Sequence, residues 1–533
     1  MPTLDWIGKK AVVNHHRQVP FHLLKKREDL SCGDPDSGNL LVQADNLLAL
    51  KALLPYYAGQ VKCIYIDPPY NTGNEGWVYN DNVNSPEMKA WLGKAVGKEA
   101  EDLTRHDKWL CMMYPRLQLL RDFLREDGAI FISIDDNEVT SLRMIMNEIF
   151  GPQNFITTII WQKNFSTKNS AKYLSESHDY IVLYAKNKNF WQPNLIPRQE
   201  KQDARYKNPD NDPRGPWTSG DLSARNYYSL GTYPIQCPSG RIIEGPPKGT
   251  YWRVSHENFE KLNNENRIWW GKDGGNVPRL KRFLSEVKDG VVPDTIWFNN
   301  EVGNTQDAKK ELLASCHFED SRSVFITPKP LNLMKRILEI STNQDSIILD
   351  SFAGSGTTGH AVLAQNKADN GSRRFILVEM DSKICNEITA GRLSNVITGY
   401  GKEPGLGGGF SYCELGSPLF DETGKIEKRV KFDDLAHHVF FAETSTPLPA
   451  RPGGKKTPLI GFYQGAAYYL LFNGILGDRS VDGGNVLTSS VLAELPSHNG
   501  PRVIFGEGCR LGPDRLKREN IIFRQIPYDI KVT

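Results

Sequence analysis

A short run of residues combines a carboxylate, two prolines and an aromatic ring. It reads Asp67-Pro68-Pro69-Tyr70 and follows the apolar segment 61–66, which we expect to be a buried strand. Consecutive prolines lack N–H groups and fix φ, so the chain must leave the sheet there with its carbonyl groups free. A flat aminated ring could stack on Tyr70 and donate its amino hydrogens to Asp67 and the Pro68 carbonyl. The run therefore suits a nucleobase amine, although a rigid turn with a rim aromatic is an equal alternative for four residues alone.

A second motif, far along the chain, contains a glycine-rich turn. Apolar residues 347–349 lead to Asp350, and Gly354-Ser355-Gly356 precede a helix that we expect to open at Thr357 or Thr358. Glycines let the backbone approach a ligand closely, and a helix N-terminus presents free N–H groups. The turn lacks the Lys-Ser/Thr ending of a phosphate loop and the third glycine of a dinucleotide site. A ligand without phosphates fits it better than a triphosphate.

The next predicted strand, 374–379, is apolar and ends in Glu379. An acid at the tip of a neighbouring strand can accept hydrogen bonds from ribose hydroxyls, although a helix N-cap or a surface acid is the simpler alternative. A glycine turn, an acid placed to bind a ribose and the lack of a phosphate-binding sequence together indicate a nucleoside cofactor. S-adenosylmethionine fits this description.

In this order and separation the two motifs resemble the permuted (beta-type) adenine-N6 DNA methyltransferases, in which Asp-Pro-Pro-Tyr precedes the cofactor loop. The chain most resembles the modification subunits of type III restriction-modification systems and related solitary DNA methyltransferases. The resemblance covers nearly the whole chain and extends to the segments 6–9, 13–16, 43–50, 178–186 and 325–330.

The resemblance implies a role for individual residues. Asp67, Pro68, Pro69 and Tyr70 would hold the amine of a flipped adenine for direct methyl transfer. The methionine end of S-adenosylmethionine would be held by Asp350, Phe352, Gly354, Ser355, Gly356 and Thr357. Glu379 would bind the ribose and Asp45 the adenine amine of the cofactor, while Thr327 and Lys329 would approach the methionine carboxylate. For Lys329, a phosphate contact or a solvated position is the alternative.

Other function classes stay open at this point. Cytosine-N4 methylation uses the same chemistry, but relatives of that kind usually carry Ser where this chain has Asp67. Cytosine-C5 methylation needs a nucleophilic Cys after Pro, and Cys237 instead precedes Pro238. RNA or protein-glutamine methylation also uses related motifs. The chain could also act mainly as a DNA-specificity subunit for a nuclease or translocase.

Composition agrees with a globular DNA-modifying enzyme. The 533 residues exceed one domain, and the chain is 39% hydrophobic with a formal net charge of +2. No apolar run reaches membrane length and no short apolar signal core is evident. The eight Cys are scattered without a CxxC pair, which predicts no metal and fits a reducing cytoplasm. The resemblance to DNA methyltransferases implies a bacterial, nucleoid-associated setting.

The elements that must position these residues form a doubly wound, Rossmann-like α/β sheet, read in permuted order. We expect an N-terminal lead at 1–40, the catalytic half of the methyltransferase domain at 41–187 and its cofactor half at 321–400. Strands are expected to end near Asp45, Asp67, Asp350 and Glu379, which places four acids at strand carboxyl ends. In such sheets ligands bind at that edge.

Two further regions complete the predicted organisation. Residues 188–320 are rich in polar residues, with basic side chains among six tryptophans, of which we expect at least half to form a local core. Basic–aromatic interleaving suits DNA, and the resemblance makes this insert the target-recognition domain for double-stranded DNA. Residues 401–533 form a C-terminal α+β region without a catalytic signature; family analogy gives it an interaction role. The same analogy implies a homodimer and a restriction or translocase partner.

Overall fold

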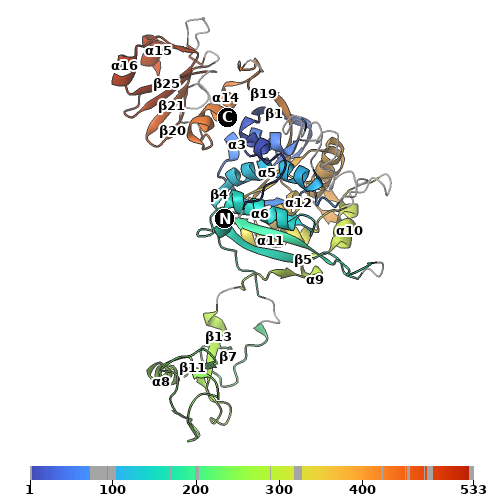
Figure 1. The fold of residues 1–533 in the computed structure, drawn as a ribbon, viewed down its shortest axis with the longest axis vertical. Helices are drawn as coiled ribbons and strands as arrows, with labels where there is room; N and C mark the ends of the chain where they lie inside the picture. Colours follow the sequence, from blue (N-terminus) through green and yellow to red (C-terminus); the bar gives the residue numbers. More distant parts are fainter. Residues whose placement is uncertain are drawn as a thin grey trace. The chain divides into compact units, whose positions relative to one another are not determined.

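The computed structural model describes residues 3–72, 93, 104–167, 171–198, 203–287, 290–316, 318, 327–421, 424–450, 452, 457–472, 475–476 and 484–526. The chain folds into two compact units (Figure 1). The large unit comprises Met1–Asn194 and Asp294–Thr533, and the small unit comprises Leu195–Pro293. The small unit lies within the insert expected at 188–320. The polar loop expected near 74–104 and the residues Phe325 and Ile326 lie almost entirely outside the described ranges.

The large unit is built on a ten-stranded sheet. Its strand order is β1 (His22–Gly33), β19 (Gly409–Pro418), β2 (Leu40–Gln43), β16 (Arg374–Glu379), β15 (Ile347–Asp350), β3 (Val61–Ile66), β4 (Leu124–Ile134), β6 (His178–Ala185), β5 (Phe155–Gln162) and β14 (Ile296–Trp297). The strands from β19 to β4 are parallel to one another. The expected antiparallel end of the sheet is confirmed, because β6 runs antiparallel to both β4 and β5.

The strand order explains why the motifs occur in permuted order along the chain. Strands β15 and β16 come late in the sequence, yet they lie between β2 and β3. The strand after which the Asp-Pro-Pro-Tyr run begins therefore lies beside the strand that leads into the glycine turn. Strands β2 and β3 follow each other in the sequence but are separated in the sheet, so the strand order switches here. Open α/β sheets bind ligands at such switch points.

Helices cover this sheet with apolar side chains. They are α3 (Asn46–Tyr57), α5 (Arg105–Phe123), α6 (Val139–Phe150), α11 (Leu331–Ser341), α12 (Thr357–Asp369) and α13 (Gly391–Thr398). Helix α5 begins at a capping box formed by Thr104 and Asp107, which satisfies N–H groups that the first turn leaves free. It contacts α3 and α6, and α11 contacts α12. All six residues of β3 are buried, as expected for a strand covered on both faces.

Strands from both terminal regions, expected at 1–40 and 401–533, belong to the main sheet. After the short helices α1 (Lys9–Val12) and α2 (His15–Gln18), β1 pairs antiparallel with β19, and β19 pairs with β2. The lead and the start of the C-terminal region are thus parts of the large unit's main sheet.

The remaining C-terminal residues form a smaller layer of helices and strands. It consists of α14 (Phe432–Thr444), α15 (Ser489–Glu494), α16 (Pro513–Arg518) and a sheet ordered β20 (Leu459–Tyr463), β21 (Ala466–Leu470), β23 (Arg502–Gly506) and β25 (Ile521–Gln525). The amphipathic segment 461–472 includes a hairpin that turns at Gln464 and Gly465, both at positive φ. Among the described residues, no helix combines the length and apolarity that crossing a bilayer requires.

The small unit has short strands around its own apolar core. Strands β12 (Ile268–Trp269), β13 (Arg279–Phe283) and β7 (Trp217–Asp221) form one antiparallel sheet, and α8 (His256–Asn264) packs nearby through Phe259. Trp217, Trp252 and Trp270 are buried in this unit. At least half of the six tryptophans are therefore core residues, as expected, although Trp191 and Trp297 belong to the large unit.

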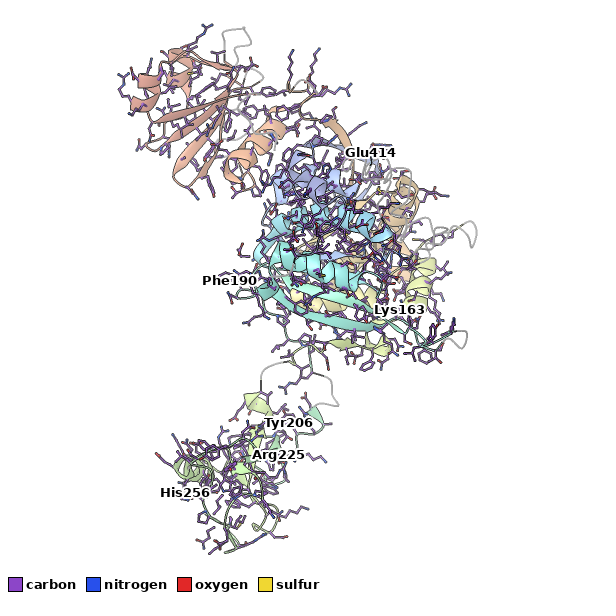
Figure 2. All side chains as sticks on the ribbon, in the orientation of Figure 1. Lys163, Phe190, Tyr206, Arg225, His256 and Glu414 are labelled. Atoms are coloured by element: carbon purple, nitrogen blue, oxygen red, sulfur yellow. The ribbon has the colours of Figure 1, made fainter. Side chains whose placement is uncertain are left out.

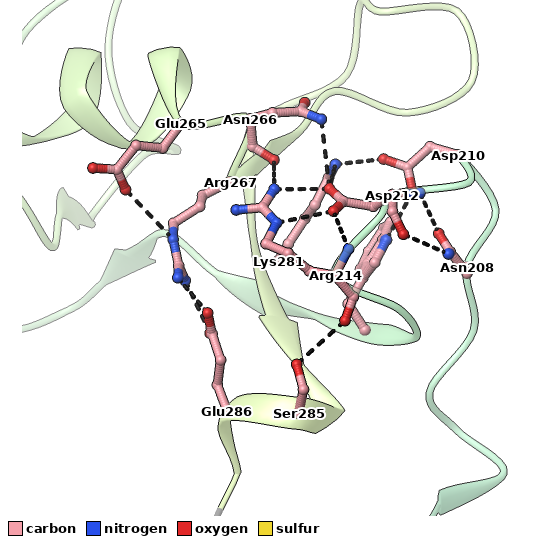
Figure 3. Close-up of polar contacts among 11 residues, drawn as sticks. Asn208, Asp210, Asp212, Arg214, Glu265, Asn266, Arg267, Lys281, Ser285 and Glu286 are labelled. Atoms are coloured by element: carbon pink, nitrogen blue, oxygen red, sulfur yellow. Dashed lines mark hydrogen bonds and ion pairs between the residues drawn. The ribbon is translucent and has the colours of Figure 1, made fainter.

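A buried ion cluster ties the strands of the small unit to the loop before β7 (Figure 3). The Lys281 side chain is 1% exposed and pairs with both Asp210 and Asp212. Arg214 donates from Nε to Oδ1 of Asp212 at 2.9 Å and from Nη2 to Oδ2 at 2.8 Å, and this contact holds the pKa of Asp212 well below its usual range. Trp217 donates to Asp210 at 2.8 Å. Every carboxylate oxygen of Asp212 thus has a donor, as buried charges require.

Candidate functional site

Four acids lie at one edge of the main sheet. Asp350 and Glu379 are the last residues of β15 and β16, Asp67 directly follows β3, and Asp45 lies two residues beyond β2. These four strands are neighbours and parallel. The carboxyl ends of parallel strands meet at the same edge, which is where such sheets bind ligands.

A pocket opens between the two motifs. Eight of the predicted site residues line it: Asp67, Thr327, Lys329, Asp350, Phe352, Gly354, Ser355 and Thr357. The other lining residues, which the sequence motifs did not single out for the site, are Tyr65, Pro328, Met334, Ala353 and Thr358.

Six predicted residues lie outside the lining of this pocket: Asp45, Pro68, Pro69, Tyr70, Gly356 and Glu379. Several of them have a structural role that explains their position. Asp45 caps helix α3 by accepting from Leu47 N and Leu48 N, and it pairs with Arg116 at 2.8 Å. An aspartate before an apolar helix is a standard cap, so this role was visible in the sequence.

Asp67 and Lys329 form a buried ion pair inside the pocket. The pair joins Lys329 Nζ to Asp67 Oδ2, and the two side chains are 9% and 14% exposed. The other carboxylate oxygen, Asp67 Oδ1, is buried without a hydrogen-bond partner of ordinary geometry among the described residues. Burial raises the pKa of Asp67, and the adjacent ammonium opposes that rise. Lys329 is therefore not the solvated residue that the sequence left as an alternative.

Tyr70 lies beside this pair. Lys329 Nζ is 5.2 Å from the centre of its ring, a cation–π distance. Burial raises the pKa of Tyr70, and the nearby Asp67 adds to the rise, so the phenol is neutral. Its hydroxyl is buried close to the Asp67 carboxylate and stabilises the ionised form of that carboxylate, although the two groups do not form a hydrogen bond of ordinary geometry.

Hydrogen bonds from neighbouring side chains hold the proline turn in place. The fully buried Trp109 of α5 donates to Pro69 O at 2.7 Å. Asn71 follows the run at φ 58° and donates to Glu138, which also accepts from His106 at 2.6 Å. These contacts fix the direction in which the chain leaves β3. No motif pointed to Trp109 or Glu138, because their effect depends on packing across the fold.

The glycine turn is tightly organised. Gly354 and Gly356 have φ of 52° and 73°, values that favour glycine. Glu379 is 1% exposed and accepts from Gly354 N at 2.9 Å, while Thr389 donates to Gly354 O at 2.6 Å. Glu379 thus shapes the turn directly, and a contact of this acid with a ribose stays a prediction.

Asp350 is the most strongly perturbed acid of the pocket. Burial raises its pKa to about 7, although Thr358 and the Phe352 N–H donate to it at 2.5 and 3.0 Å. It therefore changes charge near neutral pH. A cationic ligand group beside it would favour the ionised form.

A fully buried guanidinium links the glycine turn to the segment that carries Lys329. Arg392 Nη1 donates to Thr357 Oγ1 at 2.7 Å and to Ser355 Oγ at 3.2 Å. Thr357 Oγ1 in turn donates to Lys329 O at 3.2 Å. In this way Arg392 joins two walls of the pocket that are distant from it in the sequence. Sequence reasoning did not identify this role of Arg392.

Comparisons with known proteins agree with this geometry. Residues 61–390 match the profile of the N6_N4_Mtase family, described as DNA methylase. The chain is 37% identical to the Mod subunit of the type III restriction-modification enzyme StyLTI of Salmonella typhimurium, over 73% of this chain and 59% of that protein. It is 32% identical to the EcoPI Mod subunit of Escherichia phage P1, over 72% of this chain and 64% of that protein.

A third relative is shorter. The type II methyltransferase M.KpnI of Klebsiella pneumoniae is 31% identical, and the alignment covers 67% of this chain and 84% of that protein. This chain spans 59% and 64% of the length of the two type III relatives. The matched region contains both motifs, the pocket between them and the small unit. With a profile that covers more than half of its residues, this chain belongs to the DNA methylase family.

Proposed function

We propose that this chain is a site-specific DNA methyltransferase that methylates the N6 amine of an adenine flipped out of double-stranded DNA. The observation that carries the proposal is the buried Asp67 carboxylate, whose Oδ1 has no hydrogen bond of ordinary geometry among the described residues, in the same pocket as the glycine turn. A rigid proline turn holds this acceptor in place for an amine hydrogen, and preorganised groups of this kind lower reaction barriers.

S-adenosylmethionine supplies an electrophilic sulfonium methyl group when it is bound. The pocket residues fit this group: the glycine turn allows close approach, and Asp350 offers a carboxylate to an ammonium. We assign its methionine end to Asp350, Phe352, Gly354, Ser355, Gly356 and Thr357, with Thr327 and Lys329 near the carboxylate. Glu379 and Asp45 are assigned to its ribose and adenine.

The chain's own residues prepare the nucleophile. The amine lone pair of adenine is delocalised into the ring, so the free amine is a weak nucleophile. By accepting amine hydrogens, Asp67 and the Pro68 carbonyl favour a pyramidal nitrogen and stabilise the positive charge that develops on it. Tyr70 stacks on the base, which offsets part of the few kcal/mol that flipping costs.

The small unit is assigned to target recognition. It exposes Arg225 and Tyr227, and the Tyr227 side chain is 77% exposed (Figure 2 labels Arg225). Basic and aromatic side chains of this kind suit contacts with phosphates and bases. The relatives named Mod subunits belong to restriction-modification enzymes, and on that basis we assign this chain a homodimeric state, a restriction or translocase partner and a cytoplasmic, nucleoid-associated setting. Residues beyond β19 are assigned to the protein–protein contacts.

The test is nucleoside mass analysis of DNA from methylation-free bacterial cells that express the chain. We expect N6-methyladenine with the native chain and a loss of at least about 100-fold with Asp67→Asn, since removing one preorganised polar group costs on that order. The variant should still bind DNA. N4-methylcytosine in place of methyladenine, or near-normal methylation by the variant, would contradict the proposal. Sequencing of the same DNA maps the recognition site.

A further inference from the structure

The ion pair between Lys329 and Asp67 poses a problem for the proposed chemistry. Asp67 has to accept an amine hydrogen of the target base, yet the Lys329 ammonium already donates to its Oδ2. A cation beside the reacting nitrogen also opposes the positive charge that develops there. The same ammonium lies over the Tyr70 ring, 5.2 Å from its centre, and so occupies the place where the base would stack. The arrangement seen in the structure is therefore closed to the base, although Lys329 does not contact Asp67 Oδ1.

Lys329 has little freedom except in its side chain. Its backbone lies between Pro328 and Pro330, and its carbonyl accepts from Thr357. The following residue, Leu331, donates its N–H to Glu311 at 2.8 Å as helix α11 begins. The segment is thus fixed, while the four-carbon side chain can turn within the pocket that it lines.

The ammonium cannot leave Asp67 without another anion. A buried charge that loses its partner is strongly destabilising. The other carboxylate of the pocket, Asp350, already accepts from Thr358 and from the Phe352 N–H. A carboxylate brought in by a ligand would supply the missing partner, and the proposed methyl donor carries one.

We propose that Lys329 is a two-position switch that makes capture of the target adenine depend on prior binding of the methyl donor. Without the donor, its ammonium covers Asp67 and excludes the base amine. When the donor's carboxylate enters the pocket, the ammonium turns to it and Asp67 becomes available. Lys329 is in this sense a positioning residue, and its role rests on the proposed function. A ligand shifts such an equilibrium only through its different affinity for the two states, and here the carboxylate provides that difference.

The test measures affinity for DNA rather than turnover. Two duplexes carry the mapped recognition site, one with adenine at the target position and one with purine, which lacks the 6-amino group. The ratio of their dissociation constants reports whether Asp67 receives the amine. It is measured for the full chain alone, with S-adenosylhomocysteine, and with the decarboxylated form of S-adenosylhomocysteine.

For the native chain we expect a ratio near one without ligand and about tenfold or more with S-adenosylhomocysteine, because a hydrogen bond to a charged group has that strength. The decarboxylated ligand should leave the ratio near one. Lys329→Met should prefer adenine about tenfold without any ligand and bind S-adenosylhomocysteine more weakly. Lys329→Arg, which keeps a cation beside Asp67, should still need the ligand.

Two results would overturn the switch: a native chain that prefers adenine equally with and without S-adenosylhomocysteine, or a Lys329→Met variant, with unchanged melting temperature, that still needs it. Failure of the proposed function has another signature. In that case no protein and ligand combination prefers adenine over purine, and the expressing cells contain no N6-methyladenine.

Discussion

Lys281 in the small unit and Lys329 in the large unit are both buried against aspartates, but their surroundings differ. In the small unit, Arg214 and Lys281 together satisfy both oxygens of Asp212 (Figure 3). In the large unit, Lys329 contacts one oxygen of Asp67, and the other oxygen is buried without a hydrogen bond of ordinary geometry among the described residues. A closed cluster of this kind specifies structure, whereas an incomplete one keeps a place for a ligand.

The largest effect is expected from breaking the closed cluster. Lys281→Met leaves Asp210 and Asp212 buried without their ammonium, which should lower the free energy of unfolding of the small unit by about 3–5 kcal/mol. Hydrogen exchange should show faster exchange in β7 and β13, with β15 and β16 unchanged.

The matched control is the exposed Lys309, whose replacement by Met should leave exchange in both units unaltered. Equal protection of β13 in Lys281→Met and the native chain would mean that the cluster does not stabilise the small unit.

A smaller effect is expected at the open site from Tyr70→Ala. Loss of the stacking surface should weaken binding of the target-adenine duplex, in the presence of S-adenosylhomocysteine, by about 1–3 kcal/mol. Tyr70→Phe keeps the ring and should bind within about threefold of the native chain, since the hydroxyl makes no hydrogen bond of ordinary geometry. Titration of both variants with labelled duplex measures this difference. If Phe and Ala weaken DNA binding equally, the effect belongs to the hydroxyl and not to the ring.

Asp350 offers a pH-dependent test of the open site. Its pKa of about 7 means that it is largely neutral at pH 6 and ionised at pH 8. If it receives the ammonium of the methyl donor, affinity for S-adenosylhomocysteine should rise about tenfold between these values, one pKa unit being a factor of ten.

In Asp350→Asn the affinity should be lower and nearly independent of pH. Calorimetry at both pH values provides the measurement. If the affinity of the variant depends on pH as strongly as that of the native chain, Asp350 does not bind the ligand's ammonium.

The smallest effect is expected from Trp109→Phe, which removes the hydrogen bond to Pro69 O. Its loss should cost about 0.5–1.5 kcal/mol of stability and lower the methylation rate several-fold through the proline turn. Thermal unfolding and initial rates test this. A variant with native stability and a native rate would show that the other contacts alone hold the turn.

The sequence predicted the parallel sheet and the pocket walls well, because both depend on local signals. A buried strand before Asp67, a glycine turn after Asp350 and a helix at Thr357 can be recognised from neighbouring residues. These signals, together with the family resemblance, were enough to bring eight of the predicted residues to one pocket.

The parts that were not predicted depend on pairing between distant segments. Nothing local shows that β1 pairs with β19, some 380 residues later, or that β14 returns to the main sheet at β5. The sequence therefore did not reveal these strand pairings. The contact between Lys329 and Asp67 was missed for the same reason, since 262 residues separate them.

The pairing of Ile196 with Val291, an antiparallel bridge with hydrogen bonds of 3.0 and 2.9 Å, closes the small unit at its base. This bridge is isolated and belongs to none of the strands described above, and the hydrogen bonds of the main sheet begin again at Thr295. The segment between Ile196 and Val291 is therefore a separable insert. Exchanging it for another of similar span would leave every strand pair of the ten-stranded sheet intact. If the small unit recognises the target as proposed, its DNA specificity could change by recombination without altering the edge of the sheet that carries the pocket.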